Sequence, residues 1–221
     1  MRASFLQLRI YLWIILGVVG LSILSNIIVS ISMGGGGNPQ VSAANLFTVV
    51  LIFIGSVLPG SFFKRTINLG ATRKEFYKGI LVVYMLWSVF LAVLNILWFE
   101  LEVHFIRNYE HTFNILDVFQ WSQFGIVGMF VYQVGAYMLL LSLLNLLFSG
   151  IRHILGIIIW ISLIVLIPIF TSISSLRGIL ADGLLALLFN DSLLQGFGLT
   201  VVIACLFLAG GWWFTTRRSL V

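Results

Sequence analysis

Residues 79–99 read GILVVYMLWSVFLAVLNILWF, and this run contains no charged residue between Lys78 and Glu100. A helix rises about 1.5 Å per residue, so roughly 20 apolar residues are needed to cross the hydrocarbon core of a bilayer. The run has this length, and surface charges would interrupt it in a soluble domain. It therefore predicts a membrane-spanning helix over 79–99.

The composition of the whole chain agrees with a membrane protein. Of the 221 residues, 61% are hydrophobic and 9% are charged, whereas soluble domains carry about 25% charged residues. No polar block divides the apolar segments, so we expect a single transmembrane domain over 1–221. Cys205 is the one cysteine, which excludes an intrachain disulfide, and its apolar surroundings predict a packing role.

Six apolar runs of membrane-crossing length follow one another along the chain. The predicted spans cover about 10–32, 43–63, 79–99, 121–148, 154–171 and 197–214. The first run is longer than the apolar core of a cleaved signal peptide, so we expect it to remain as an anchor. The segment 175–190 repeats leucine at helical spacing but is too short to cross the bilayer, which predicts an interfacial or re-entrant helix.

The distribution of lysine and arginine predicts the orientation of the spans. The outer loops are expected at 33–42, 100–120 and 172–196. With the amino terminus in the cytoplasm, the inner segments hold ten basic residues, whereas the outer loops hold only Arg107 and Arg177. If the segment 175–190 were a seventh span, Arg217 and Arg218 would lie outside, so six spans fit the distribution of basic residues better.

The sequence thus predicts an all-α polytopic membrane protein with six transmembrane helices, both termini cytoplasmic, and a short outer helix between spans five and six. Its formal charge is +5, but the basic residues form short clusters between apolar runs. Such clusters are typical of membrane topology and of contact with anionic lipid. We therefore expect membrane lipid, and not nucleic acid, as the partner of these charges.

No pattern of a catalytic or nucleotide-binding centre occurs in the chain. It lacks a GxSxG nucleophile elbow, an HExxH zinc helix and a GxxxxGK(S/T) phosphate loop. His104 and His111 share an outer loop with several acidic residues, yet their spacing matches no ligand pattern, which favours a solvated loop over a metal site. We expect no catalytic residue, no metal and no cofactor in this chain.

The polar residues inside the predicted spans are neutral. Ionisable residues at membrane depth are typical of ion-driven carriers, and their absence away from the span ends disfavours that class. Interhelical hydrogen bonds are a more common role for neutral polar residues than substrate contacts. We expect that role for Asn26, Asn45, Asn95, Gln133 and Asn145.

Small residues recur every seven positions in the fourth span, at Gly128, Gly135, Ser142 and Ser149. A seven-residue step keeps them near one side of a helix, with a drift of about 20° per step. Small side chains allow two helices to approach closely. The pattern predicts a packing face, either within the chain or between chains.

The inner loop 62–78 carries five basic residues and one acid among aromatic and apolar residues. Thr72 and Glu75 have the spacing of a capping box, in which each side chain satisfies a free amide at a helix start. Gly70 supplies the backbone freedom that a turn requires. We therefore expect a helix to begin at Arg73 and to continue into the third span.

Residues 69–77, LGATRKEFY, resemble the inner-loop signature of type-2 ATP-binding-cassette (ABC) permeases of bacteria. The six spans, the cytoplasmic ends and the outer helix are similar to that family as well. The resemblance implies that 62–78 is a coupling loop, with a docking element over 62–69, that contacts a separate ATPase subunit. The implied docking residues are Phe62, Phe63, Lys64, Arg65, Ile67, Leu69, Gly70, Thr72, Arg73, Lys74, Glu75 and Phe76.

The resemblance further implies a complex of two permease subunits, identical or homologous, with two ATPase subunits that bind ATP and Mg. It implies residence in the bacterial plasma membrane and export of an amphipathic or hydrophobic substrate, with antimicrobial peptides as one candidate. A membrane scaffold or sensor subunit that transports nothing would share the basic loop and is the alternative. An intramembrane enzyme is disfavoured because the chain shows no catalytic constellation.

Overall fold

The computed structural model describes residues 40–108, 112–190 and 192–218. The predicted first span, 10–32, and Asn26 within it lie outside the described residues. The described part is almost wholly helical, and two strands of two residues each form its only sheet. In that sheet β1 (Gln40–Val41) pairs in parallel with β2 (Thr112–Phe113).

The long helices of the described chain are α2 (Leu46–Val57), α4 (Arg73–His104), α6 (Gly125–Gly150), α7 (Ile154–Ser172), α8 (Ser174–Leu188) and α9 (Leu193–Arg217). The shorter ones are η1 (Ala43–Asn45), the π-helical η2 (Leu58–Phe62), α3 (Phe63–Asn68), η3 (Ile106–Asn108), α5 (Ile115–Val118) and η4 (Trp121–Phe124). Because η1, α2, η2 and α3 follow one another without a break, they form one continuous helix over Ala43–Asn68.

Five helices are long and apolar enough to cross a membrane: Ala43–Asn68, Arg73–His104, Trp121–Gly150, Ile154–Ser172 and Leu193–Arg217. They coincide with the predicted spans two to six, so the chain has the character of an α-helical membrane protein. Their ends differ from the expected ones where the flanking residues are good helix formers. The second span continues past residue 63 to Asn68, because Lys64 and Arg65 stay exposed within a helix instead of ending it.

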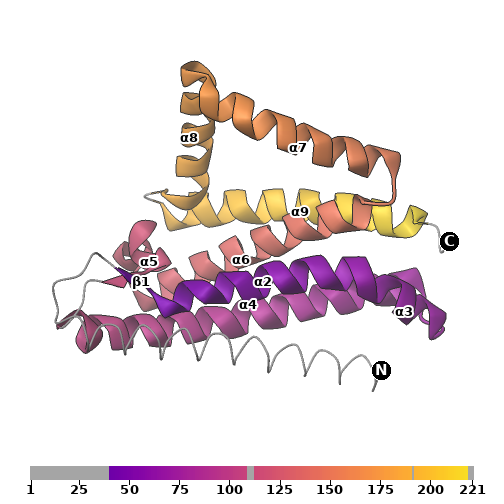
Figure 1. Ribbon diagram of the computed structural model, residues 1–221. Helices are drawn as coiled ribbons and strands as arrows, with labels where there is room; N and C mark the ends of the chain where they lie inside the picture. Colours follow the sequence, from indigo (N-terminus) through magenta and orange to yellow (C-terminus); the bar gives the residue numbers. More distant parts are fainter. Residues whose placement is uncertain (1–39, 109–111, 191, 219–221) are drawn as a thin grey trace.

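The helices α2, α4, α6 and α9 lie side by side, with α6 in contact with each of the others (Figure 1). One end of this bundle carries the connection between α3 and α4 and is called here the turn end. The opposite end carries β1, β2 and α5 and is called the strand end. A buried cluster from α2, α4 and α6, which includes Leu51, Ile80 and Leu141, forms the core between them.

The packing face predicted on the fourth span lies inside the bundle. Gly128, Gly135, Ser142 and Ser149 are all buried. A Cβ atom added to Gly135 would lie 2.9 Å from a ring carbon of Phe197 on α9, so no larger side chain fits there without a shift. The small residues therefore bring α6 close to α9 within this chain.

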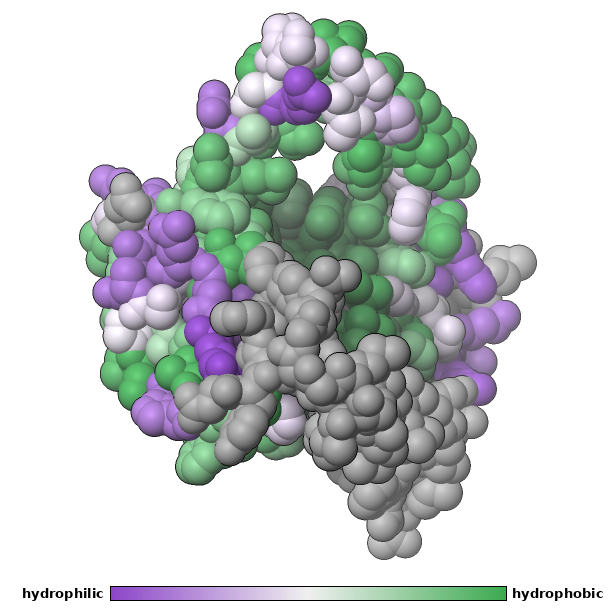
Figure 2. Space-filling view, turned by 60° about the vertical axis from the view of Figure 1, so that its left-hand side comes forward, coloured by the Kyte–Doolittle hydropathy of each residue, from purple (hydrophilic) through white to green (hydrophobic). Residues whose placement is uncertain are grey.

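The helices α7 and α8 form an arm that diverges from the bundle (Figure 1). Over these two helices, Gly156 at the base of α7 is the one buried residue. A Cβ atom at Gly156 would overlap the backbone of Gly150, so glycine is required where the arm leaves α6. The arm is apolar over most of its surface, and an opening separates it from the bundle (Figure 2). The short outer helix expected over 175–190 is confirmed as a helix, α8.

Candidate functional site: the turn between α3 and α4

The turn at 69–72 joins two helices through a compact set of backbone hydrogen bonds. Leu69 N–H donates to the Arg65 carbonyl (3.2 Å) and Gly70 N–H donates to the Ile67 carbonyl (2.9 Å). Gly70 has φ +93°, a left-handed conformation that favours glycine and that ends α3 in the usual way. The chain then reverses within four residues, so the coupling loop expected over 62–78 is helical except at 69–72.

The capping box expected at the start of the next helix is present. Glu75 N–H donates to Thr72 Oγ1 (3.2 Å), and Thr72 N–H donates to Glu75 Oε2 (2.8 Å). Each side chain satisfies a backbone amide that a helix start would leave without a partner. These bonds define Arg73 as the first residue of α4.

Aromatic side chains form a buried base beneath the turn. Phe63 and Phe76 pack edge to face with ring centroids 5.2 Å apart, and Phe62 is buried with them. These three residues were expected to dock a partner, but their side chains face the core of the chain. The rotation of each helix places these side chains on its inward side. Ile67 also packs partly against this core. In this chain the three aromatic residues support the turn from below, and a role of these residues in docking stays a prediction.

The remaining expected docking residues lie at the surface. Lys64, Arg65, Leu69, Gly70, Thr72, Lys74 and Glu75 are exposed, and Arg73 is half-buried. Leu69, at the tip of the turn, is 67% exposed although it is a large apolar side chain. The tip therefore offers an apolar contact surrounded by positive charge, which suits a partner surface that is apolar with an acidic rim.

Positive charge collects at the turn end of the described chain. Eight basic residues lie there: Lys64, Arg65, Arg73, Lys74, Lys78, Arg152, Arg217 and Arg218. Glu75 is the one acidic residue at this end among the described positions, and the capping box holds its carboxylate. A membrane surface with anionic lipids or an acidic protein surface would complement this field.

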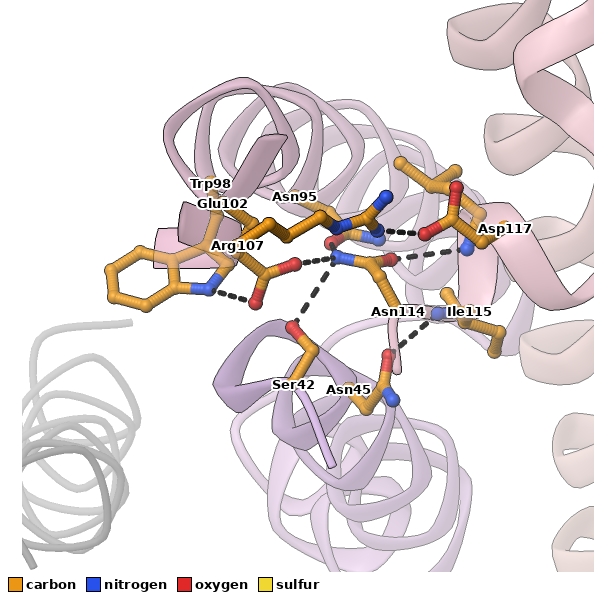
Figure 3. Close-up of polar contacts among 10 residues, drawn as sticks. Ser42, Asn45, Asn95, Trp98, Glu102, Arg107, Asn114, Ile115 and Asp117 are labelled. Atoms are coloured by element: carbon orange, nitrogen blue, oxygen red, sulfur yellow. Dashed lines mark hydrogen bonds and ion pairs between the residues drawn. The ribbon is translucent and has the colours of Figure 1, made fainter. Parts of the chain in front are cut away.

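The strand end holds a buried polar network that the sequence did not reveal (Figure 3). Glu102 was expected in a solvated outer loop, but it lies on α4 and is 1% exposed. Trp98 Nε1 donates to its Oε1 (2.8 Å) and Asn114 Nδ2 donates to its Oε2 (2.9 Å). Glu102 follows Asn95 by seven residues, so both face the core side of α4, and this spacing was the available signal.

Asn114 connects this network to the neighbouring segments (Figure 3). Its Nδ2 group also lies 3.3 Å from Ser42 Oγ and 3.5 Å from Asn95 Oδ1, and its Oδ1 accepts from Leu116 N–H (3.0 Å). The segment after β2 is thereby fastened to the start of the second span and to α4. The ion pair between Arg107 and Asp117 lies beside the network.

The polar residues expected to connect helices do so in part. Asn145 Nδ2 donates to Tyr77 Oη on α4 (3.2 Å), which is a bond between helices. Gln133 Nε2 donates to Tyr137 Oη (2.7 Å) one turn along the same helix, α6. Asn45 Oδ1 accepts from Ile115 N–H (3.0 Å) and joins the second span to α5.

Within the described residues no three potential metal ligands come together. His104 Nδ1 lies 2.9 Å from the Glu100 carbonyl at the surface, and His111 lies outside the described residues. The comparisons with known proteins add no relative, since no family model, no curated protein and no solved structure matches the chain. The exposed turn between α3 and α4 is the candidate functional site.

Proposed function

We propose that this chain is the membrane-spanning subunit of an ABC exporter of a bacterial plasma membrane. In this proposal six spans cross the membrane, both termini are cytoplasmic, and the turn end faces the cytoplasm. Separate ATPase subunits bind ATP and Mg and dock at the turn. Two permease subunits, identical or homologous, then move an amphipathic or hydrophobic substrate outward.

The observation that carries the proposal is the exposed turn on a rigid base. Leu69 is exposed at the tip, and Phe63 packs against Phe76 below. Lys64, Arg65 and Lys74 are exposed on the two helices that the turn joins. A contact that must transmit force needs a fixed support, and the buried rings with the capping box provide one. The bias of lysine and arginine towards cytoplasmic loops explains the basic residues. It does not explain an exposed leucine at the tip of the turn.

The apolar arm supports the choice of substrate. Its helices leave the bundle, and an apolar surface lines the opening between them (Figure 2). A molecule that partitions into the bilayer could reach such a surface from the side without first crossing water. Export of an antimicrobial peptide remains one candidate within this class, suggested by the family resemblance.

Co-purification with any ABC ATPase subunit that is encoded beside its gene tests the proposal. The native chain is expected to form a complex and to change the ATPase rate. Reversing two exposed charges at the turn, R65E with K74E, is expected to abolish the complex. R177E, which reverses an exposed charge on α8, is the matched control and should leave it intact. If R65E/K74E binds as well as the native chain, or if no ATPase associates, the docking proposal is wrong and a scaffold or sensor role is favoured.

A further inference from the structure

Arg218, the residue that follows α9, is almost completely buried at the turn end. Its Nη1 donates to the Pro59 carbonyl (2.5 Å) and its Nη2 to the Gly60 carbonyl (3.2 Å). Its guanidinium also lies over the Phe63 ring, 4.7 Å from the centroid. The planar guanidinium makes two carbonyl contacts and one ring contact at once. A lysine ammonium at this position would not hold the same fixed geometry.

The two carbonyls belong to the π-helical segment η2. A π-helical turn is rare and is often found at functional sites, because it disturbs the regular hydrogen-bond ladder. Pro59 contributes to that disturbance, since it has no N–H to donate. Burial, with the nearby charge of Arg152, lowers the pKa of Arg218, so the guanidinium stays in place against an electrostatic cost.

A second arginine joins α9 to the beginning of α4. Arg73 Nη1 donates to the Thr216 carbonyl. One turn further along α4, Tyr77 Oη donates to the Leu208 carbonyl (2.5 Å) and its ring packs against Trp212 at 5.1 Å. The final turns of α9 are therefore attached to both sides of the turn, to η2 before it and to α4 after it.

The other end of α9 lies against the arm. Tyr132 Oη on α6 donates to the Leu187 carbonyl (2.8 Å) and Trp121 Nε1 on η4 donates to the Leu188 carbonyl (2.8 Å), so α6 and η4 hold the end of α8, which also contacts α9. Between its two ends α9 runs along the small-residue face of α6, where Gly135 and Gly196 allow close contact. Helices that pack closely against each other can slide by small shear movements.

We propose that Arg73 and Arg218 are positioning residues that clamp α9 to the turn, so that a displacement of the turn moves α9. The inference rests on the proposed function for the source of the displacement, an ATPase subunit that binds the turn. The clamp itself is a property of this chain and can be tested without that subunit.

Spin-label distances in the full chain in lipid nanodiscs test the clamp. Cysteines replace two exposed residues, Leu69 at the turn and Ala209 on α9, in a C205S background. The native arginines should give a narrow distance distribution. R218Q should broaden it and should speed amide exchange in 58–68 by about tenfold, since charge-assisted hydrogen bonds are lost. R218K, which keeps the charge and one donor group, should recover part of the change.

R217Q is the matched control, because Arg217 is the adjacent residue, is exposed, and lies over the Trp213 ring of its own helix, 4.4 Å from the centroid. It removes the same charge from the same end and should leave both readings unchanged. On the other side of the turn, R73Q is the test variant and K74Q is its control. This second pair tests the clamp if R218Q does not fold. If R218Q and R73Q match their controls, the clamp is wrong.

Addition of the ATPase subunit with a trapped nucleotide then tests transmission. A second label pair, at Leu97 on α4 and Leu199 on α9, reports movement of α9. The native chain should show a distance change at this pair, and R218Q should lose the change while it still binds the ATPase. An unchanged response in R218Q would overturn the transmission. If no ATPase binds the native chain, the proposed function fails, while the distances at the turn still decide the clamp.

Discussion

Glu102 lies where a carboxylate is costly, because the residue is 1% exposed and the indole and amide groups that donate to it are neutral. Removal of a charge from water is unfavourable unless hydrogen bonds replace the lost hydration. The Trp98 indole and the Asn114 amide supply these bonds, one to each oxygen. The acid thereby joins α4 to the segment after β2, and the stability of the strand end depends on it.

The substitution E102Q should weaken this connection. A glutamine keeps the size of the side chain but replaces one of the two accepting oxygens by an amide NH2 group. That NH2 group would face the N–H of either Trp98 or Asn114, and two donors cannot bond to each other. We expect the free energy of unfolding in detergent to fall by about 1–3 kcal/mol. E100Q, two residues earlier and partly exposed, is the control and should have little effect. Equal stability of the two variants would show that Glu102 does not accept both bonds.

Thr72 is decisive at the turn because it caps α4. T72A removes the hydroxyl that accepts from Glu75 N–H, and loss of a helix cap costs about 1 kcal/mol of stability. We expect a lower unfolding free energy and faster amide exchange in the first turn of α4. T72S keeps the hydroxyl and should restore both values. A T72S variant as unstable as T72A would point to the lost methyl group instead.

At the scale of elements, α6 and α9 make the most extensive helix contact in the described part of the bundle. Gly196 on α9 faces the Tyr132 side chain, and a Cβ atom there would overlap its hydroxyl. Tyr132 has little freedom to move, because it stacks on Trp121 and donates to the Leu187 carbonyl. Close packing between helices replaces the hydrophobic effect as the main source of association in lipid.

The pair G196A and G198A tests this contact within one helix. G196A should force Tyr132 from its position and lower the unfolding free energy by about 1–3 kcal/mol, as overpacking does. A Cβ atom at Gly198 would meet no atom within 4 Å, so G198A should be neutral or slightly stabilising, since alanine favours helix more than glycine. If both variants have the same stability in thermal unfolding, α9 does not pack on α6 in this register.

At the scale of the whole molecule, charge and apolar surface are separated. The basic residues gather at the turn end, whereas Glu100, Glu102 and Asp117 lie at the strand end. The exposed apolar side chains cover α4, α7 and α9 between the two ends. A bilayer satisfies this arrangement, because its core accepts apolar side chains and its anionic leaflet attracts cations.

The proposed orientation predicts opposite labelling at the two ends. In a C205S background, L69C at the turn end and F105C at the strand end are matched, since each native side chain is 67% exposed. In intact cells an impermeant thiol reagent should modify F105C and should reach L69C only after the membrane is opened. Ready modification of L69C from outside would overturn both the orientation and the docking proposal.

Local patterns in the sequence were sufficient for the spans two to six, the helix 174–188, the capping box at Thr72 and the buried small residues of α6. Each of these depends on neighbours within a few turns of one helix, where apolar length, cap spacing and side-chain size act directly. The tertiary structure decided which residues of the turn segment and of the expected outer loop face the core. It buried Phe62, Phe63 and Phe76, which were expected to dock a partner, and it buried Glu102. It also brought Arg218 to the Pro59 carbonyl, 159 positions away in the chain. Such contacts depend on the rotation of whole helices against one another, and no short stretch of sequence contains that information.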